Sequence, residues 1–252
     1  MPFNNFYFSG QGKVFAAPRN TAGASLAYVD LGNVPVLTIQ LETDVVEHKE
    51  STTGSRLLDY RLIRENRARV SMTLENFSRR NLMFMVYGTE SNTTTTSTIT
   101  GETLIPAGHT LSAGDVFFTK FPNISALTLT PSSGSLATPA NYTVDLTTGQ
   151  VTLVGTQTAA APVTAAYTAA TYESVQLFRA ANPERSLRFV GLNTAATNAP
   201  VTVELYRIIF DPTANINLIN DELAQFELTG SVLFDSTKNA DPTLGGFGRI
   251  IA

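Results

Sequence analysis

Four segments of the chain alternate apolar and polar residues, which is the pattern of a strand with one buried face and one wet face. They are 36–46, 68–76, 201–210 and 223–234. In the first, Leu37, Ile39, Leu41 and Val45 share the apolar side. The polar sides carry, among others, Thr38, Gln40, Glu42, Asp44, Arg69, Glu75, Thr202, Glu204, Tyr206, Gln225 and Glu227. One wet face on every strand predicts an antiparallel sheet that is solvated on one side.

These wet faces are predicted to be acidic. Their carboxylates, Glu42, Asp44, Glu75, Glu204 and Glu227, stand against Arg69 alone. A surface of this kind repels polyanions instead of holding them.

One amphipathic helix is predicted after the second strand. Asn76 or Ser78 can cap its first turn, and Gly88 is expected to be the left-handed residue that ends it. Helical spacing relates its apolar residues, Phe77, Leu82, Phe84, Met85 and Val86. We expect this helix to lie across the apolar face of the sheet.

The middle of the chain changes character and is interpreted as an insertion, 93–171. It is rich in Thr, Ser, Ala and Gly and nearly free of charge. A hairpin is predicted where Tyr142, Val144 and Leu146 alternate, followed by a Thr148-Gly149 turn and by Val151 and Leu153. The insertion is expected to be a small β subdomain. It is either a passive outward elaboration or a surface that binds a sugar.

The predicted fold is mainly β: an antiparallel β sandwich or barrel with one flanking α-helix and an inserted small β subdomain. The core domain is discontinuous, comprising 1–92 and 172–252, with an extended arm at 46–68.

The arm concentrates charges of both signs. Its charged residues are Glu47, Lys49, Glu50, Arg56, Asp59, Arg61, Arg64, Glu65 and Arg67. A nucleic-acid arm would be basic without the acids. Leu57, Leu58, Leu62 and Ile63 are set among the charges, and exposed apolar residues need a partner surface. The arm is interpreted as a contact between subunits, the alternative being a solvated hairpin with ordinary surface ion pairs.

Composition argues against an enzyme, a metal site or a cofactor. There is no cysteine, and His48 and His109 are the only histidines. The segment GQGK at 10–13 lacks the rest of a phosphate-binding loop, and no GxSxG motif is present. A net charge of −4 gives no electrostatic footprint for binding nucleic acid. Neither a signal peptide nor a long apolar run is found, so we expect a soluble protein made in a cytoplasm, without membrane contact.

The order of these elements resembles the major tail tube proteins of long-tailed bacteriophages. The resemblance spans about 10–90 and 172–251 and excludes the insertion. It is carried by the following segments in order: GQGKVFAAPRN, the leucine and isoleucine strand, the EHKES-x-x-G-x-R arm, RARVSMTLENFS, NLMFMVYG, NPERSLRFVGLNT, VTVELYRIIFDP, LINDELAQFELTGSVLFD and GGFGRI.

This resemblance implies a virion protein that assembles in the host cytoplasm. Subunits of that family form six-fold rings with a continuous inner β barrel, and the rings stack into a hollow tube through an extended loop. The implied partners are further copies of the chain, a tape measure protein, and tail terminator and distal tail proteins, while genomic DNA passes through the lumen. The residues expected to face the lumen are Thr38, Gln40, Glu42, Asp44, Glu75, Glu204, Gln225 and Glu227.

A second hypothesis comes from another functional class. The Thr-rich middle is compatible with a secreted or surface β-sandwich module that binds a carbohydrate or receptor. That hypothesis predicts exposed aromatic binding residues, yet the chain contains no tryptophan.

Overall fold

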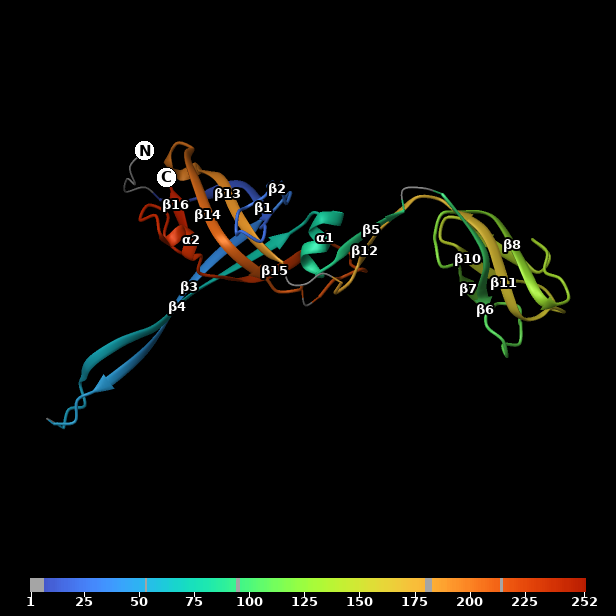
Figure 1. Ribbon diagram of the computed structural model, residues 1–252, viewed down its shortest axis with the longest axis horizontal. Helices are drawn as coiled ribbons and strands as arrows, with labels where there is room; N and C mark the ends of the chain where they lie inside the picture. Colours follow the sequence, from blue (N-terminus) through green and yellow to red (C-terminus); the bar gives the residue numbers. More distant parts are fainter. Residues whose placement is uncertain (1–6, 53, 94–95, 180–182, 214) are drawn as a thin grey trace. The chain divides into compact units, whose positions relative to one another are not determined.

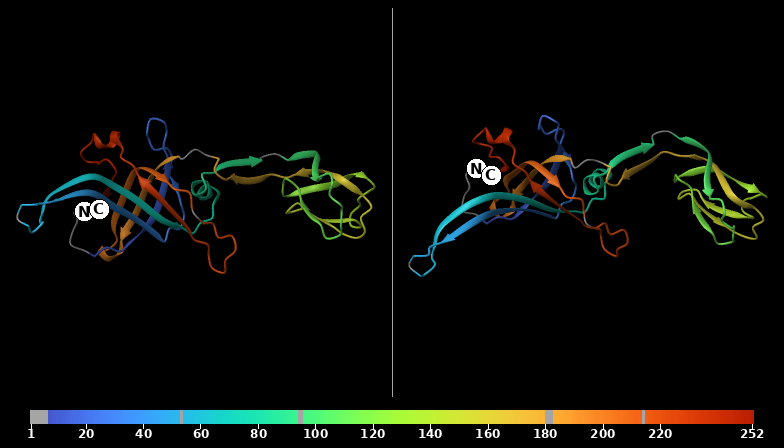
Figure 2. Two further views of the ribbon diagram at one scale, coloured as in Figure 1. Left: turned by 90° about the horizontal axis from the view of Figure 1, so that it is seen from below. Right: turned by 60° about the horizontal axis from the view of Figure 1, so that its bottom comes forward.

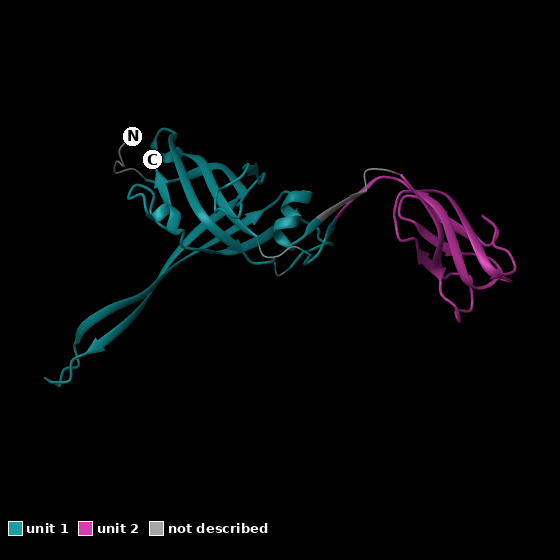
Figure 3. Ribbon diagram, viewed as in Figure 1, with its two compact units in different colours: residues 1–89, 175–252 teal, residues 90–174 magenta. Residues whose placement is uncertain are grey.

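The computed structural model describes residues 7–52, 54–93, 96–179, 183–213 and 215–252. The chain forms two compact units (Figure 3). Unit 1 comprises 1–89 and 175–252, and unit 2 comprises 90–174. The sequence placed the insertion at 93–171, three residues inside unit 2 at each end.

Unit 1 is built on one antiparallel eight-stranded sheet (Figure 1). Its order is β2-β1-β13-β14-β15-β4-β3, with β16 also paired to β14. The strands are β1 Gly10–Pro18, β2 Val29–Asp30, β3 Val36–Lys49, β4 Leu58–Leu74, β13 Glu184–Asn193, β14 Ala199–Phe210, β15 Phe226–Val232 and β16 Gly248–Ile251. The mainly β, antiparallel fold class predicted from alternation is confirmed.

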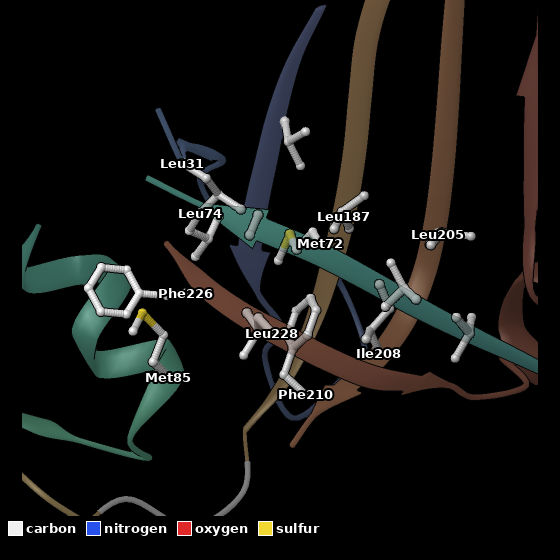
Figure 4. Packing of buried hydrophobic residues seen from close by; sticks show 14 of the residues in the cluster. Leu31, Met72, Leu74, Met85, Leu187, Leu205, Ile208, Phe210, Phe226 and Leu228 are labelled. Atoms are coloured by element: carbon white, nitrogen blue, oxygen red, sulfur yellow. The ribbon is translucent and has the colours of Figure 1, made fainter. Parts of the chain in front are cut away.

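The concave side of this sheet holds the core of unit 1 (Figure 4). Met72 and Leu74 of β4 pack with Phe226 and Leu228 of β15, and all four are nearly inaccessible to solvent. Burying one such side chain contributes about 1.5–3 kcal/mol. Helix α1 (Arg79–Met85) closes one end of the core, since Met85 belongs to the same cluster.

The ends of α1 show where sequence reasoning succeeded and where it failed. Ser78 is the N-cap, and its hydroxyl accepts a hydrogen bond of 3.2 Å from the amide of Asn81. The left-handed residue after the helix is Tyr87, at φ +49°, and not Gly88 as predicted. Gly88 is needed for space instead, because a Cβ there would lie 2.4 Å from Cγ1 of Val175.

Tyr206 is buried, although it was predicted to lie on the wet face of its strand. The register with β13 shifts between the pairs Arg185–Ile208 and Leu187–Leu205, so β14 carries an extra residue there. Leu205 and Ile208 consequently both belong to the core, whereas Tyr206 does not. Tyr206 is covered by the C-terminal segment instead, and its hydroxyl donates to the carbonyl of Leu244 at 3.0 Å. The predicted last strand is also shorter than expected. Its N-terminal part lies in the loop before β15.

Unit 2 is a small β sandwich. One sheet has the order β7-β10-β9 and the other β6-β11-β8, and both contribute to a single core. The predicted hairpin is present as β9 and β10, with Gly149 at φ +74° in its turn. The elements are β6 Ser97–Ile105, β7 Val116–Phe118, β8 Ile124–Ser133, β9 Tyr142–Asp145, β10 Gln150–Leu153 and β11 Ala160–Ala169.

Four smaller elements complete the chain. Strands β5 (Thr89–Thr93) and β12 (Tyr172–Gln176) pair with each other where the chain leaves and re-enters unit 1. A 3-10 turn, η1, covers Thr194–Ala196, and a short helix, α2, covers Ser236–Asn239. The prediction of one flanking helix therefore missed α2, whose single turn is too short to give a helical pattern.

A buried ion network ties the C-terminal segment to the sheet. Arg19 donates to Asp235 at 2.8 Å, and both side chains are almost fully buried. Arg19 also donates to the carbonyl of Tyr206. Burial alone would raise the pKa of Asp235, but hydrogen bonds from Thr237 and Arg19 outweigh it and lower that pKa below its ordinary value. The charged form of Asp235 is therefore favoured in the folded protein.

Replacing Asp235 should destabilise unit 1. The variant Asp235→Asn leaves the buried Arg19 guanidinium with only the more distant carboxylate of Glu184, at 3.7 Å, as counter-charge. This should cost less than the roughly 3–5 kcal/mol of a fully unpaired buried charge. Because the pKa of Asp235 is lowered on folding, its contribution is present above the ordinary pKa of 3.8 and is lost as pH falls below that value. Urea unfolding of both proteins should therefore show a gap at pH 7 that narrows at pH 3. The exposed Asp221→Asn is the control, and a constant gap would contradict the network.

Candidate functional site

The arm is a two-stranded ribbon, formed by β3 and β4, that extends beyond the rest of the sheet (Figure 1). Strands β3 and β4 pair along almost their whole lengths, whereas β15 pairs with β4 only at 68–74. Residues 58–67 of β4 therefore extend past β15 together with 42–49 of β3. Ten residues of extended strand span roughly 33 Å. An isolated two-stranded hairpin is marginally stable in water, so such a ribbon is a poor structure without a partner.

Two cross-strand pairs of the arm join opposite charges. Glu47 of β3 stands opposite Arg61 of β4, and Glu42 stands opposite Arg67. Arg67 donates to Glu65 at 2.7 Å, and this hydrogen bond lowers the pKa of Glu65. These pairs are exposed, so they contribute little to folding.

The remaining predicted arm residues are distributed between the strands and the tip. Lys49 is the last residue of β3 and stands opposite Leu58. The Asp59 carboxylate lies 2.6 Å from Nδ1 of His48. Glu50 and Arg56 lie in the turn between the strands, where Arg56 takes a left-handed conformation at φ +51°. Arg64 lies at a register shift of β4 and has no residue directly opposite.

Apolar side chains occupy both faces of the arm. The register shift at Arg64 places Ile63 on the face of Val45, which continues the apolar side of β3. Val46 and Leu62 pair on the opposite face. Of these, Val46, Leu62 and Ile63 are substantially exposed. A ribbon that is apolar on two sides requires partner surfaces on both.

The residues expected to face the lumen share one face of the sheet in unit 1. Cross-strand rows join Thr38 to Ser71 and Thr229, and Gln40 to Arg69 and Ser231. Glu42 and Asp44 continue the same face into the arm, and Glu227 stands beside Thr73. At the end of β4, Glu75 accepts from Gln225 at 3.0 Å and also from Asn33.

This face is less acidic than the sequence indicated. Glu204 is held between Arg188, at 3.2 Å, and Arg249, at 2.7 Å. Arg67 stands opposite Glu42 on the neighbouring strand. The expectation that Arg69 alone opposes the acids was wrong, because β13 and β16 bring their arginines to β14 from distant parts of the sequence.

The sheet is open, and its gap is lined by apolar side chains. Strands β3 and β2 are its two outermost strands. A cavity of about 690 Å³ lies where β3 approaches β1, lined by Val14, Leu37, Ile39, Phe189 and Val203 among others. An unprotected strand edge of this length is a template for pairing with another chain.

Chemistry other than assembly finds little support in the described residues. In the ranges that the structure describes, no three His, Asp or Glu side chains gather as a metal-binding group. His48 lies in the arm and His109 in unit 2, where it contacts Asp115 at 2.9 Å. The GQGK segment belongs to β1, where Gly12 is packed against Gly191. In the same ranges, no helix combines the length and apolar character needed to cross a bilayer.

Sequence reasoning missed one conspicuous surface feature. Leu218, Ile219 and Leu223 lie between β14 and β15 and are among the most exposed aliphatic residues of the described chain. Leu223 is the first residue of the predicted last strand. The sequence signal was present, because Asp221 and Glu222 interrupt the alternation just before that residue.

Comparison with protein families identifies the family of the chain. The family described as protein of unknown function UCP028589 matches residues 7–251, a range that includes parts of both units. No curated protein matches the chain. Since the match extends over nearly the full length, the chain belongs to the family described as protein of unknown function UCP028589.

Proposed function

We propose that this chain is a structural virion protein of the tail tube type, which assembles into hexameric rings that stack as a hollow tube. The observation that supports this most is the arm, a two-stranded ribbon with paired charges and apolar side chains on both faces. A contact between copies would cover those side chains. It would also stabilise a hairpin that is marginal by itself.

The open sheet supports self-assembly independently of the arm. The outer edge of β3 ends the strand order, and the apolar cavity beside it adjoins β1. Closing a ring of copies would remove these edges, as closed barrels do. A head-to-tail contact that repeats along an axis then generates a filament.

The polar face of the sheet is suited to line a conduit for DNA. Its arginines are largely held by carboxylates, as in the group formed by Glu204, Arg188 and Arg249. Because these arginines are already paired with carboxylates, they would form few contacts with DNA phosphates, and little affinity would come from the release of counterions. In this proposal the lumen holds a tape measure protein during assembly and lets DNA slide through afterwards. The tail terminator and distal tail proteins cap the tube.

The alternative, a surface β-sandwich module that binds a carbohydrate or receptor, draws on unit 2. Phe118 of β7 is 61% exposed, next to Gln150 of β10 on the same face. Aromatic faces and amides are typical of sugar contacts. A protein that remains monomeric at high concentration would favour this alternative.

Electron microscopy of purified protein tests the main proposal directly. Rings or tubes with a central channel are the expected result, accompanied by a concentration-dependent increase in sedimentation rate. Solitary particles under every condition of concentration and salt would refute it.

Reversing the charge of the arm should abolish stacking while the monomer stays folded. In Arg61→Glu with Arg64→Glu, Glu47 faces a like charge and any acidic partner surface is repelled. Exchanging the two charges, Glu47→Arg with Arg61→Glu, keeps opposite charges facing each other within the hairpin. It reverses the charges that the arm presents to a neighbouring copy. Both variants should lose tubes by sedimentation, whereas Arg80→Glu on α1 should retain them. Undiminished tubes in the first variant would exclude the arm from the contact.

Removing the insertion should leave tube formation intact if it is decoration. Because β5 pairs with β12, residues 94–171 can be replaced by an Asn-Gly turn that joins Thr93 to Tyr172. Micrographs of this variant should show tubes of smaller outer diameter. A soluble, folded variant without tubes would place unit 2 in the assembly contact.

A further inference from the structure

A loop of unit 1 presents aliphatic side chains to solvent without covering them. This aliphatic loop, residues 217–223, lies between β14 and β15 (Figure 2). Leu218 is 80% exposed, Ile219 98% and Leu223 87%. Exposed aliphatic residues that occur singly need no explanation, but three within six residues mark a contact surface.

The stems of the loop are fixed to the body of unit 1. Ile216 and Ala224 pack against the hydrophobic core on either side of the exposed segment. Before it, Thr213 donates its amide to the carbonyl of Met85 at 2.8 Å and its hydroxyl to the carbonyl of Glu227 at 2.9 Å. The projecting side chains are therefore presented from an anchored base.

Two carboxylates accompany the aliphatic side chains. Asp221 and Glu222 lie between Ile219 and Leu223, and both residues are exposed. Within the described part of the chain, neither carboxylate takes part in an ion pair or a hydrogen bond. A surface that complements this loop must be apolar and must also supply a cation.

A groove with those properties lies where β15 ends beside the base of the arm. It has a volume of about 450 Å³ and is bounded by β4, the end of β15 and the C-terminal segment. Phe234 is 46% exposed and contacts Phe247 edge to face, with the ring centres 5.9 Å apart. Arg67 and Arg69 also line it, together with Glu65, which accepts from Arg67 at 2.7 Å. The Arg69 guanidinium has no ion-pair partner among the described residues and is the cation that the groove offers.

The loop and the groove occupy opposite ends of the same strand. The loop immediately precedes β15, and Ser231 and Val232 at the end of β15 line the groove. Seven residues of strand span about 20 Å, so a loop cannot reach the groove of its own chain. The groove includes residues at the base of the arm, and in both views of Figure 2 the arm leaves unit 1 away from the loop.

We propose that the aliphatic loop of one copy inserts into this groove of the next copy. Leu218, Ile219 and Leu223 would then cover the exposed edges of Phe234 and Phe247, while Asp221 and Glu222 approach Arg67 and Arg69. The contact joins unlike surfaces, so it repeats in one direction and is the kind that builds rings or filaments. This inference rests on the proposed function, which requires copies to associate. It also places the groove and the arm in the same contact between neighbouring copies.

The other large apolar opening of unit 1 is a poorer match for the loop. The cavity between β1 and β3 is lined by apolar and uncharged polar residues, with no lysine or arginine among them. Insertion there would leave Asp221 and Glu222 without a counter-charge next to apolar surface, which is unfavourable.

Engineered cysteines test the contact cleanly because the chain has none of its own. In Ile219→Cys with Ser231→Cys, one cysteine lies on the loop and the other at the exposed edge of the groove. A disulfide needs Cα atoms within about 7 Å, which excludes a bond within one chain. Oxidation of the assembled double variant should give a ladder of dimers, trimers and longer species on a non-reducing gel.

The controls separate this contact from assembly in general. Ile219→Cys with Ser135→Cys, which moves the second thiol to an exposed position of unit 2, should give no ladder. Dimers from Ile219→Cys alone would indicate a loop-to-loop contact and overturn the proposal. Tubes of the double variant that form without a ladder would overturn it and leave the proposed function standing. A native protein that never associates would overturn both.

A charge exchange provides a second measurement. Asp221→Arg with Glu222→Arg should reduce the yield of sedimenting assemblies at least tenfold, and adding Arg67→Glu with Arg69→Glu should restore much of it. Failure of the second pair to restore assembly, in protein whose unfolding transition is unchanged, would contradict the pairing. Unimpaired assembly of the triple variant Leu218→Asp, Ile219→Asp, Leu223→Asp would assign the loop to a different partner, such as a lipid surface.

Discussion

The continuous pairing of β3 with β4 is the constraint on which unit 1 depends. Within the body, β4 lies between β3 and β15, so its apolar side faces the core and both of its edges are paired. Where β15 stops, the same two strands continue with only each other as neighbours. One structural element thus supplies both a central strand of the core and a projecting ribbon. Movement of the arm is mechanically coupled to the sheet, because no hinge or linker separates the two.

Register shifts decide which chemistry each face carries. The shift at Arg64 moves Ile63 to the face that the core side chains occupy in the body, and it leaves apolar residues on both sides of the arm. The shift in β14 lets Leu205 and Ile208 both join the core and leaves Tyr206 outside it, under the C-terminal segment. A one-residue change in register exchanges the two faces of a strand, so these local irregularities determine what a partner would encounter.

Several buried or partly buried charges of unit 1 form ion pairs with residues far away in the sequence. Asp235 and Arg19 are far apart in the sequence, yet they form a buried pair that fixes the C-terminal segment against β1. Glu204 is clamped by arginines from β13 and β16. The exposed charges of the arm, the loop and the groove contribute little to folding, and they are the ones free to select a partner.

The sequence alone determined the fold class, the insertion, the cap of α1 and the existence of a charged arm, because each depends on local periodicity or composition. Alternation over 36–46 and 68–76 was sufficient to identify β3 and β4, although it could not show that both strands run on into the arm. Tertiary structure decided the burial of Tyr206, the arginines beside Glu204, the role of Gly88 and the exposure of the loop before β15. Each of these depends on which distant strand lies alongside, and strand pairing leaves no local trace in a single sequence.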